Sequence, residues 1–374
     1  ESTARFAAEE LGDDVSERDA ASTFWREGYN RCGRFGLLGL PVPREYGGQG
    51  EDIVTTVAAM EGLGYGCPDS GLAFALSASL WTVTMPILAF GNDAQKQRWL
   101  PGLCDGTLFG ANAASEPAAG SDIFSMQTRA ERQAEDSGGG WVLNGQKIWC
   151  SRAAYAHMGF GLFRSDSESK RHHGLTYFVF PLDADGITVR PIPQLDGEPG
   201  FAEVFYDDVF VPDEDVLGGV GDGWAVAMST AGNERGLSLR SPGRFCATAD
   251  RLVKLWKQHG APAEHRDAVV SAWKGAEAYR LYTWATVSRL LDGGQIGYAG
   301  SVNKVFWSNL DVAMHETALD ILGATSELRD GEHAAWMDGY LFSLSGPIYA
   351  GTNEVQKGVI AERILSLPRE PKGA

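Results

Sequence analysis

The residue types that most often carry chemistry are dispersed along this chain. The cysteines are widely spaced and form no Cys-x-x-Cys pair, and only His172 and His173 are adjacent among the seven histidines. Neither a disulfide framework nor a zinc site is therefore predicted, and buried free thiols and structural or solvated histidines are expected. The five cysteines are Cys32, Cys67, Cys104, Cys150 and Cys246.

One glycine-rich stretch resembles a phosphate-binding loop only superficially. Gly219, Gly221 and Gly223 have the wrong spacing for a dinucleotide fingerprint, and they do not join a strand to a helix of a βαβ unit. No Walker-type Gly-Lys-Ser/Thr occurs in the chain. We expect this stretch to be a hinge into a helix.

Composition narrows the class of protein. The chain has 374 residues, 44% of them hydrophobic, and a formal net charge of -17. A charge of this sign argues against broad contact with nucleic acid, and no run of Lys and Arg offsets it. Residues 1 to 14 are acidic, and no stretch looks like a run of about 18 apolar residues, so we expect a soluble cytoplasmic protein that is not membrane-bound.

The texture of the sequence changes twice along the chain. A helical pattern extends to about Thr107, and it is followed by short segments rich in β-branched and aromatic residues, such as Leu175 to Val179 and Ile187 to Ile192. After Gly223 the helical pattern returns. Three domains are therefore predicted: residues 1–111, 112–216 and 217–374. The order does not match the βαβ alternation of a parallel sheet, which disfavours a nicotinamide-binding fold.

Several short motifs, in order along nearly the whole chain, give more specific information than the periodicity of hydrophobic residues. Gly36 to Gly50 includes Gly-Leu-Leu-Gly-Leu-Pro and Glu-Tyr-Gly-Gly-Gln-Gly, and Ser115 to Asp122 reads Ser-Glu-Pro-Ala-Ala-Gly-Ser-Asp. Leu143 to Trp149 and Ile348 to Gln356 complete the series. Together they resemble the FAD-dependent acyl-CoA dehydrogenase family. The resemblance implies an α+β fold, mainly α, with an N-terminal helical domain, a middle β domain and a C-terminal four-helix bundle.

The resemblance also implies a cofactor site. A flat isoalloxazine must be held at its edge by donors and covered on one face by a planar side chain. By resemblance, Ser115 and Ser151 donate to the flavin edge, Trp149 covers the ring, and the backbone from Asn112 to Ser121 follows the cofactor. The remaining FAD positions that it implies are Ala114, Cys150, Gly351, Thr352 and Glu354. The last three belong to a motif that commonly reaches a neighbouring subunit, so the resemblance implies a homo-oligomer, a dimer or tetramer.

The catalytic base is assigned by comparison within the family. Dehydrogenation of an acyl thioester requires a carboxylate that removes the α-proton, in a pocket that raises its pKa. Straight-chain members carry this Glu directly before the Gly-Thr of the C-terminal motif, where this chain has Ala350. The isovaleryl-CoA and long-chain branch carries it on the first helix of the last domain, where this chain has Glu234 beside Arg235. Glu234 is therefore the predicted base, and its alternative is a structural helix residue.

Two further assignments stay open. Arg235 and Ser121 lie, by resemblance, near the substrate's pantetheine arm and phosphates, and Arg235 has an equal claim to be a buried structural residue. After Pro242 the family's Glu-Arg-x-x-Phe-Gly motif is missing, so the FAD pyrophosphate clamp is unassigned. This departure leaves room for acyl delivery on a carrier protein instead of CoA.

The resemblance leaves three functions to compare. The first is FAD-dependent dehydrogenation of an acyl thioester, with an electron acceptor such as an electron-transfer flavoprotein. The second is a flavin-dependent monooxygenase on the same fold, which needs no carboxylate base. The third is a non-catalytic subunit of a heteromeric dehydrogenase.

Overall fold

The computed structural model describes residues 1–374 except 13–14, 21–22, 135, 137, 170, 194–199, 237–240, 329–332 and 370–374. For residues 16, 19–20 and 231–236 it describes the backbone but not the side chains. The chain divides into two units. The helical unit comprises Glu1–Gly12, Val57–Ala73 and Gly232–Ala374, and the sheet unit comprises Asp13–Thr56 and Phe74–Ala231.

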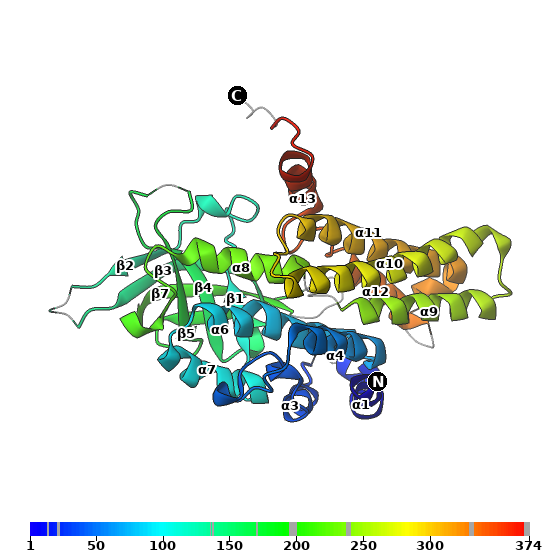
Figure 1. The fold of residues 1–374 in the computed structure, drawn as a ribbon, viewed down its shortest axis with the longest axis horizontal. Helices are drawn as coiled ribbons and strands as arrows, with labels where there is room; N and C mark the ends of the chain where they lie inside the picture. The colour runs from blue at the N-terminus through cyan, green and yellow to red at the C-terminus, as the bar shows by residue number, and fades with distance from the viewer. Residues whose placement is uncertain are drawn as a thin grey trace. The chain divides into compact units, whose positions relative to one another are not determined.

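The sheet unit is built on a sheet of eight strands in the order β6-β7-β3-β2-β4-β5-β8, with β1 paired to β4 (Figure 1). Most pairs are antiparallel, but β1 and β2 each run parallel to β4. The strands are β1 Gly110–Ala113, β2 Arg129–Arg132, β3 Trp141–Ser151, β4 Met158–Arg164, β5 Leu175–Pro181, β6 Ile187–Ile192, β7 Phe201–Val211 and β8 Val216–Leu217.

Strand β5 shows why these residues form a buried strand. Successive side chains of a strand point to opposite faces of the sheet. Tyr177 and Val179 accordingly join one hydrophobic core, whereas Phe178 and Phe180 join another. The sheet is therefore covered on both faces at this strand, and the alternation of aromatic and β-branched residues suits both surfaces.

Helices complete the sheet unit. The helix α7 (Asp93–Asp105) begins with a capping box, in which the Asn92 side chain accepts from the Gln95 backbone and the Gln95 side chain accepts from the Asn92 backbone. Its Trp99, Leu100 and Leu103 pack into the core that contains Tyr177. The other helices within this unit are α2 Val15–Ala20, α3 Arg26–Arg34 and α6 Met85–Phe90.

The helical unit has its own core, formed mainly by α9 (Pro242–Gln258), α10 (Arg266–Leu291), α11 (Ala299–Leu322) and α12 (Ala334–Ser343). These four helices pack on one another as a bundle (Figure 1), and α13 (Asn353–Val359) packs on α11. The helix α1 (Ser2–Glu10) also belongs to this unit. Three helices continue from one unit into the other: α4 Ile53–Gly66, α5 Ser70–Ala78 and α8 Gly223–Gly236.

The predicted fold class, α+β and mainly α with a middle β domain and a C-terminal bundle, is confirmed. The hinge expected at Gly219 to Gly223 leads directly into α8, and the predicted domain limits stay predictions. Strands β1, β2, β4 and β8 were not among the predicted strands.

One helical run is apolar enough to cross a membrane by length and composition alone. It spans Ser70–Phe90, and 72% of its most apolar window is buried within the protein. Core helices of soluble proteins pass the same test. The sequence analysis does not single out this run, because Ser and Thr interrupt its apolar residues.

Candidate functional site

The first part of the predicted cofactor site is β1 and the loop that follows it. Asn112 lies on β1, and its Oδ1 accepts a hydrogen bond of 2.9 Å from the Tyr177 hydroxyl on β5. Ala114 and Ser115 come next and are half-buried. The loop then reaches Ser121, whose side chain is exposed.

Glu116 anchors this loop to the protein interior. Its side chain is buried, and its carboxylate accepts from Lys147 Nζ at 2.9 Å and from the backbone N–H of Gln127 and Thr128 at 2.6 and 3.0 Å. Lys147 is on β3, and it also donates to the Ala114 carbonyl at 3.3 Å. The buried ion pair therefore anchors the loop, which leaves Ser115 little freedom to move.

The pKa values of this pair follow from burial and mutual attraction. Burial alone would raise the pKa of Glu116, but the Lys147 charge and the donated N–H groups outweigh it and lower that pKa. Burial lowers the pKa of Lys147, and the Glu116 charge opposes this shift. The loop is therefore held by a carboxylate that remains ionised at neutral pH.

Trp149 lies near the end of β3, next to a residue that is hydrogen-bonded to the same loop. The backbone N–H of Ile148 donates to the Ser115 carbonyl at 2.9 Å, which joins the end of β3 to the loop. Trp149 has a φ of 59°, and the pairing of β3 with β7 shifts register between Lys147 and Cys150. This irregularity re-aims the strand. The indole is 56% exposed and meets the Phe201 ring edge-on at 5.9 Å between centroids.

Cys150 and Ser151 have different environments. Cys150 is buried, and this burial raises the pKa of its thiol to about 12. Its side chain belongs to the core of the sheet unit, so only its backbone is available to a cofactor. Ser151 is half-buried and pairs with Phe201 in the ladder of β3 and β7.

These observations fit the flavin that the resemblance implies. An exposed planar indole beside a rigid loop, with half-buried hydroxyls at Ser115 and Ser151, is suited to cover a flat ring and hydrogen-bond its edge. Asn112, Ala114, Ser115, Trp149 and Ser151 are brought together through these contacts. Among the described residues, Ser121 makes no hydrogen bond or ion pair with this group.

The second part of the predicted site is the turn before α13 in the helical unit. Gly351 has a φ of 82°, a value that few other residues tolerate, and Thr352 caps α13 by accepting from the Val355 N–H at 3.2 Å. Glu354 is exposed in the first turn of the helix. A hydrogen bond from its own backbone and another from Thr352 lower the pKa of Glu354.

A second buried lysine holds this turn. Lys304 on α11 donates to Asn353 Oδ1 at 2.8 Å and to the Pro347 carbonyl at 3.0 Å. Ser308 Oγ donates to the same Oδ1 at 3.1 Å, and the Asn353 N–H donates to the Pro347 carbonyl at 2.8 Å. The chain around Gly351 and Thr352 is therefore fixed against α11.

The predicted base lies at the limit of what the structure describes. The backbone of Glu234 and Arg235 is in the last turns of α8, but their side chains lie outside the described residues. Ala350, at the alternative position for a base, has a φ of 53° and a methyl side chain that cannot take a proton.

The residues that hold the two loops in place were not predicted from the sequence. Glu116 and Asn353 lie inside the recognised motifs, and Lys147 lies in the motif that ends at Trp149. A signal was therefore present for these three. Lys304 lies in no quoted motif, and only its fully buried position in α11 reveals it. In the part of the chain that the structure describes, no group of three or more His, Cys, Asp or Glu residues is placed to hold a metal ion.

Comparisons with known proteins match nearly all of the chain. Family models for the N-terminal, middle and C-terminal domains of acyl-CoA dehydrogenases match residues 1–107, 111–209 and 221–365. The chain is 40% identical over 349 residues to Acyl-CoA dehydrogenase IpdE1 of Mycolicibacterium smegmatis, which covers 90% of this chain and 87% of that protein.

Solved structures give the same result. The crystal structure of the prolyl acyl carrier protein oxidase AnaB has a TM-score of 0.90 and 28% identity, with 98% of this chain and 97% of that chain covered. The structure of PigA with FAD and proline has a TM-score of 0.90 and 26% identity, with 98% and 96% covered.

Proposed function

Because the chain belongs to the acyl-CoA dehydrogenase family, we propose that Glu234 is the base of an FAD-dependent α,β-dehydrogenation of an acyl thioester. The family consists of oxidoreductases that act on CH–CH bonds and use FAD. The observation that carries the assignment of the base is Ala350, which occupies the position of the straight-chain base and has no carboxylate. Glu234 occupies the position that the isovaleryl-CoA and long-chain branch uses.

Bound FAD supplies the acceptor for the hydride that leaves Cβ. The chain's own residues have three tasks. Lys147 and Glu116 hold the loop that presents Ser115, Trp149 covers one face of the flavin site, and Glu234 takes the α-proton. A carboxylate suits the last task when the pocket excludes water and raises its pKa toward neutrality.

Replacement of Glu234 by Gln tests the proposal. The amide is nearly isosteric, so FAD should stay bound, but it cannot accept the α-proton. Flavin reduction under anaerobic conditions, with a panel of acyl thioesters, should slow by about 10²–10⁴-fold. Glu316→Gln is a matched control, because Glu316 is an exposed carboxylate on α11 of the same unit.

Each contrary result points to another function. Flavin reduction at the wild-type rate in Glu234→Gln would return Glu234 to a structural role. Hydroxylation of a substrate by the wild type supplied with reduced flavin and O2, with no reduction by any thioester, would establish the monooxygenase. Failure of the purified chain to take up FAD would favour a non-catalytic subunit.

We propose CoA as the carrier of the acyl group, in preference to a carrier protein. The support is sequence similarity, since identity is 40% to an acyl-CoA dehydrogenase and 28% to an acyl carrier protein oxidase. Family membership likewise supports an electron-transfer flavoprotein as the electron acceptor. Comparison of flavin reduction by the same acyl group on CoA and on a carrier protein would test the first choice.

We further propose a cytoplasmic homo-oligomer, a dimer or tetramer. Large apolar side chains on the outside of α10 and α11, among them Leu281 at 60% and Phe306 at 42% exposure, support self-association. The five cysteines are buried and free of disulfides, which suits a reducing compartment. Light scattering of the purified chain would measure the oligomeric state.

A further inference from the structure

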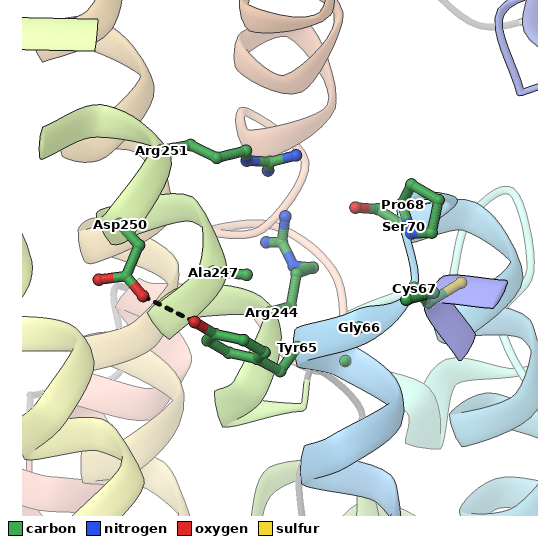
Figure 2. Close-up of a pocket in the computed structure, with 11 residues that line it drawn as sticks. Tyr65, Gly66, Cys67, Pro68, Ser70, Arg244, Ala247, Asp250 and Arg251 are labelled. Atoms are coloured by element: carbon green, nitrogen blue, oxygen red, sulfur yellow. Dashed lines mark hydrogen bonds between the residues drawn. The ribbon is translucent and has the colours of Figure 1, made fainter. Parts of the chain in front are cut away.

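A cavity of about 440 Å³ lies within the helical unit, apart from every residue assigned above. One wall is α9, which contributes Arg244 and Arg251, and the opposite wall is the end of α4 with the start of α5 (Figure 2). Ala8 of α1 also lines it. Ligand cavities commonly have about 300–1,000 Å³, so a small organic molecule would fit.

Arg244 is a buried cation that lines this cavity. Its side chain has 10% exposure, and its Nη2 forms an ion pair with Asp311 on α11. Its Nε is buried and has no hydrogen-bond partner among the described residues. Because protein covers that atom, an anion in the cavity would have to bind the outer nitrogens of the guanidinium.

Arg251 lies about two turns further along α9, so it is on the same face of the helix as Arg244. Figure 2 shows the two guanidinium groups on the same side of α9. It donates to Thr248 Oγ1 at 3.1 Å and lies 5.8 Å from the centre of the Trp336 ring. Partial desolvation and the Arg244 charge both lower the pKa of Arg251, although part of its side chain is exposed. Two guanidinium groups therefore line one cavity, and among the described residues only that of Arg244 is ion-paired with a carboxylate.

The nearby carboxylates leave Arg251 without an ion pair among the described residues. Among the described residues, Asp311 contacts Arg244 and no carboxylate forms an ion pair with Arg251. Asp250 lines the cavity, but its Oδ2 accepts from the Tyr65 hydroxyl at 3.0 Å, as the dashed line in Figure 2 shows. Two arginines therefore stand against two carboxylates here, but Asp311 is bound to Arg244 and Asp250 to Tyr65, so Arg251 has no ion-pair partner among the described residues.

The remaining lining residues decide what kind of anion fits. Ala8, Cys67, Pro68 and Ala247 present a mostly apolar surface around the arginines. A free phosphate would leave this surface uncovered, whereas an organic acid would cover it with its hydrocarbon part and place its carboxylate on the planar guanidinium groups.

We propose that this cavity binds the carboxylate of a small, largely apolar organic acid through Arg244 and Arg251. Two sources have this chemistry: a separate small acid, or a carboxylate carried by the acyl group of the substrate. Both would use the same ion pairs, and different measurements distinguish them.

Calorimetric titration of the FAD-loaded protein tests binding itself. The probes are cyclohexanecarboxylate, its neutral isostere cyclohexanecarboxamide, and inorganic phosphate. We expect the carboxylate to bind and the amide not to bind. In Arg251→Gln the carboxylate should bind roughly 10- to 100-fold more weakly, because a charge-assisted hydrogen bond is lost. Arg251→Lys should retain part of the affinity.

Arg266→Gln is the matched control, because Arg266 is exposed at the start of α10 and does not line the cavity. It should bind the carboxylate as the wild type does. Equal binding of carboxylate and amide, an unchanged affinity in Arg251→Gln, or no binding of the carboxylate would overturn the proposal. Binding of phosphate in place of the carboxylate would overturn it as well.

A kinetic measurement identifies the source, and this arm rests on the proposed function. The wild type and Arg251→Gln are compared on an acyl-CoA that ends in a carboxylate and on its methyl ester. An increase in KM confined to the carboxylate form would place the anion on the substrate. Carboxylate binding in the titration without that difference would identify a separate acid. If no thioester reduces flavin, the proposed function fails while the titration still decides the cavity.

Discussion

The sheet unit and the helical unit each use a fully buried lysine to hold a loop of the predicted cofactor site, but the lysines bind different partners. Lys147 meets the carboxylate of Glu116 at 2.9 Å. Lys304 donates hydrogen bonds to the neutral oxygens of Asn353 and Pro347. The charge of Lys304 also helps to lower the pKa of the exposed Glu354.

This difference determines how each loop responds to damage. Removing one member of a buried ion pair leaves an uncompensated charge in a poorly polarisable interior. Removing Lys304 takes one donor from each of two neutral oxygens, and each oxygen keeps another donor. The loop that presents Ser115 should therefore depend strictly on its pair, whereas the turn at Gly351 should tolerate loss of its lysine better.

The largest effect is expected for Lys147→Met. Glu116 would keep the N–H groups of Gln127 and Thr128 but lose its counter-charge, at a cost of roughly 3–5 kcal/mol. Chemical unfolding should show this loss of stability, and the purified variant should retain less FAD, measured by its flavin absorbance.

The double variant Lys147→Met with Glu116→Gln provides the control, and it keeps the test informative if the single variant does not fold. The single amide oxygen can still accept from Thr128, the Gln127 N–H loses its acceptor, and no charge remains buried. The double variant should therefore be more stable than Lys147→Met alone. Equal stability of the two would show that the charge of Glu116 is not what makes the lysine necessary.

A smaller effect is expected for Lys304→Met. Asn353 Oδ1 keeps the Ser308 hydroxyl as a donor, and the Pro347 carbonyl keeps the Asn353 N–H. Because neither oxygen is left without a partner, the cost should be about 1 kcal/mol. Unfolding of the two lysine variants side by side measures the difference, and a loss as large as that of Lys147→Met would remove the distinction between the loops.

How far the sequence predicts these features depends on the local pattern. The strand Ile187–Ile192 matches its predicted limits, because β-branched residues alternate there between turn residues. The strand β4 does not show such a pattern, since it is buried on both faces and contains Gly159 and Gly161. At Gly159 an added Cβ would lie 2.2 Å from the Phe180 ring, so close packing requires a glycine there. Glycine is uncommon in strands, and it therefore makes this strand difficult to predict from the sequence.

The candidate site shows the same limit. The motifs locate Ser115, Trp149 and Thr352, and the structure places each at a surface or a cap. A lysine is normally exposed, so nothing in the sequence predicts that Lys147 and Lys304 are buried. The role of Glu234 stays a prediction, because its side chain lies outside the described residues.

The smallest effect is expected for Thr352→Ala. Thr352 Oγ1 accepts the Val355 N–H at 3.2 Å and so caps α13. Loss of such a cap costs about 0.5–2 kcal/mol, and the low end is expected here because a short helix near the chain end can fray locally while the bundle stays folded. Hydrogen exchange should therefore rise in α13 and not in α11. Thr352→Ser keeps the hydroxyl and should restore protection. If both variants bind FAD as the wild type does, Thr352 is only a cap. If only Thr352→Ala loses FAD, with exchange in α13 unchanged, the hydroxyl serves the cofactor, as the family resemblance predicts.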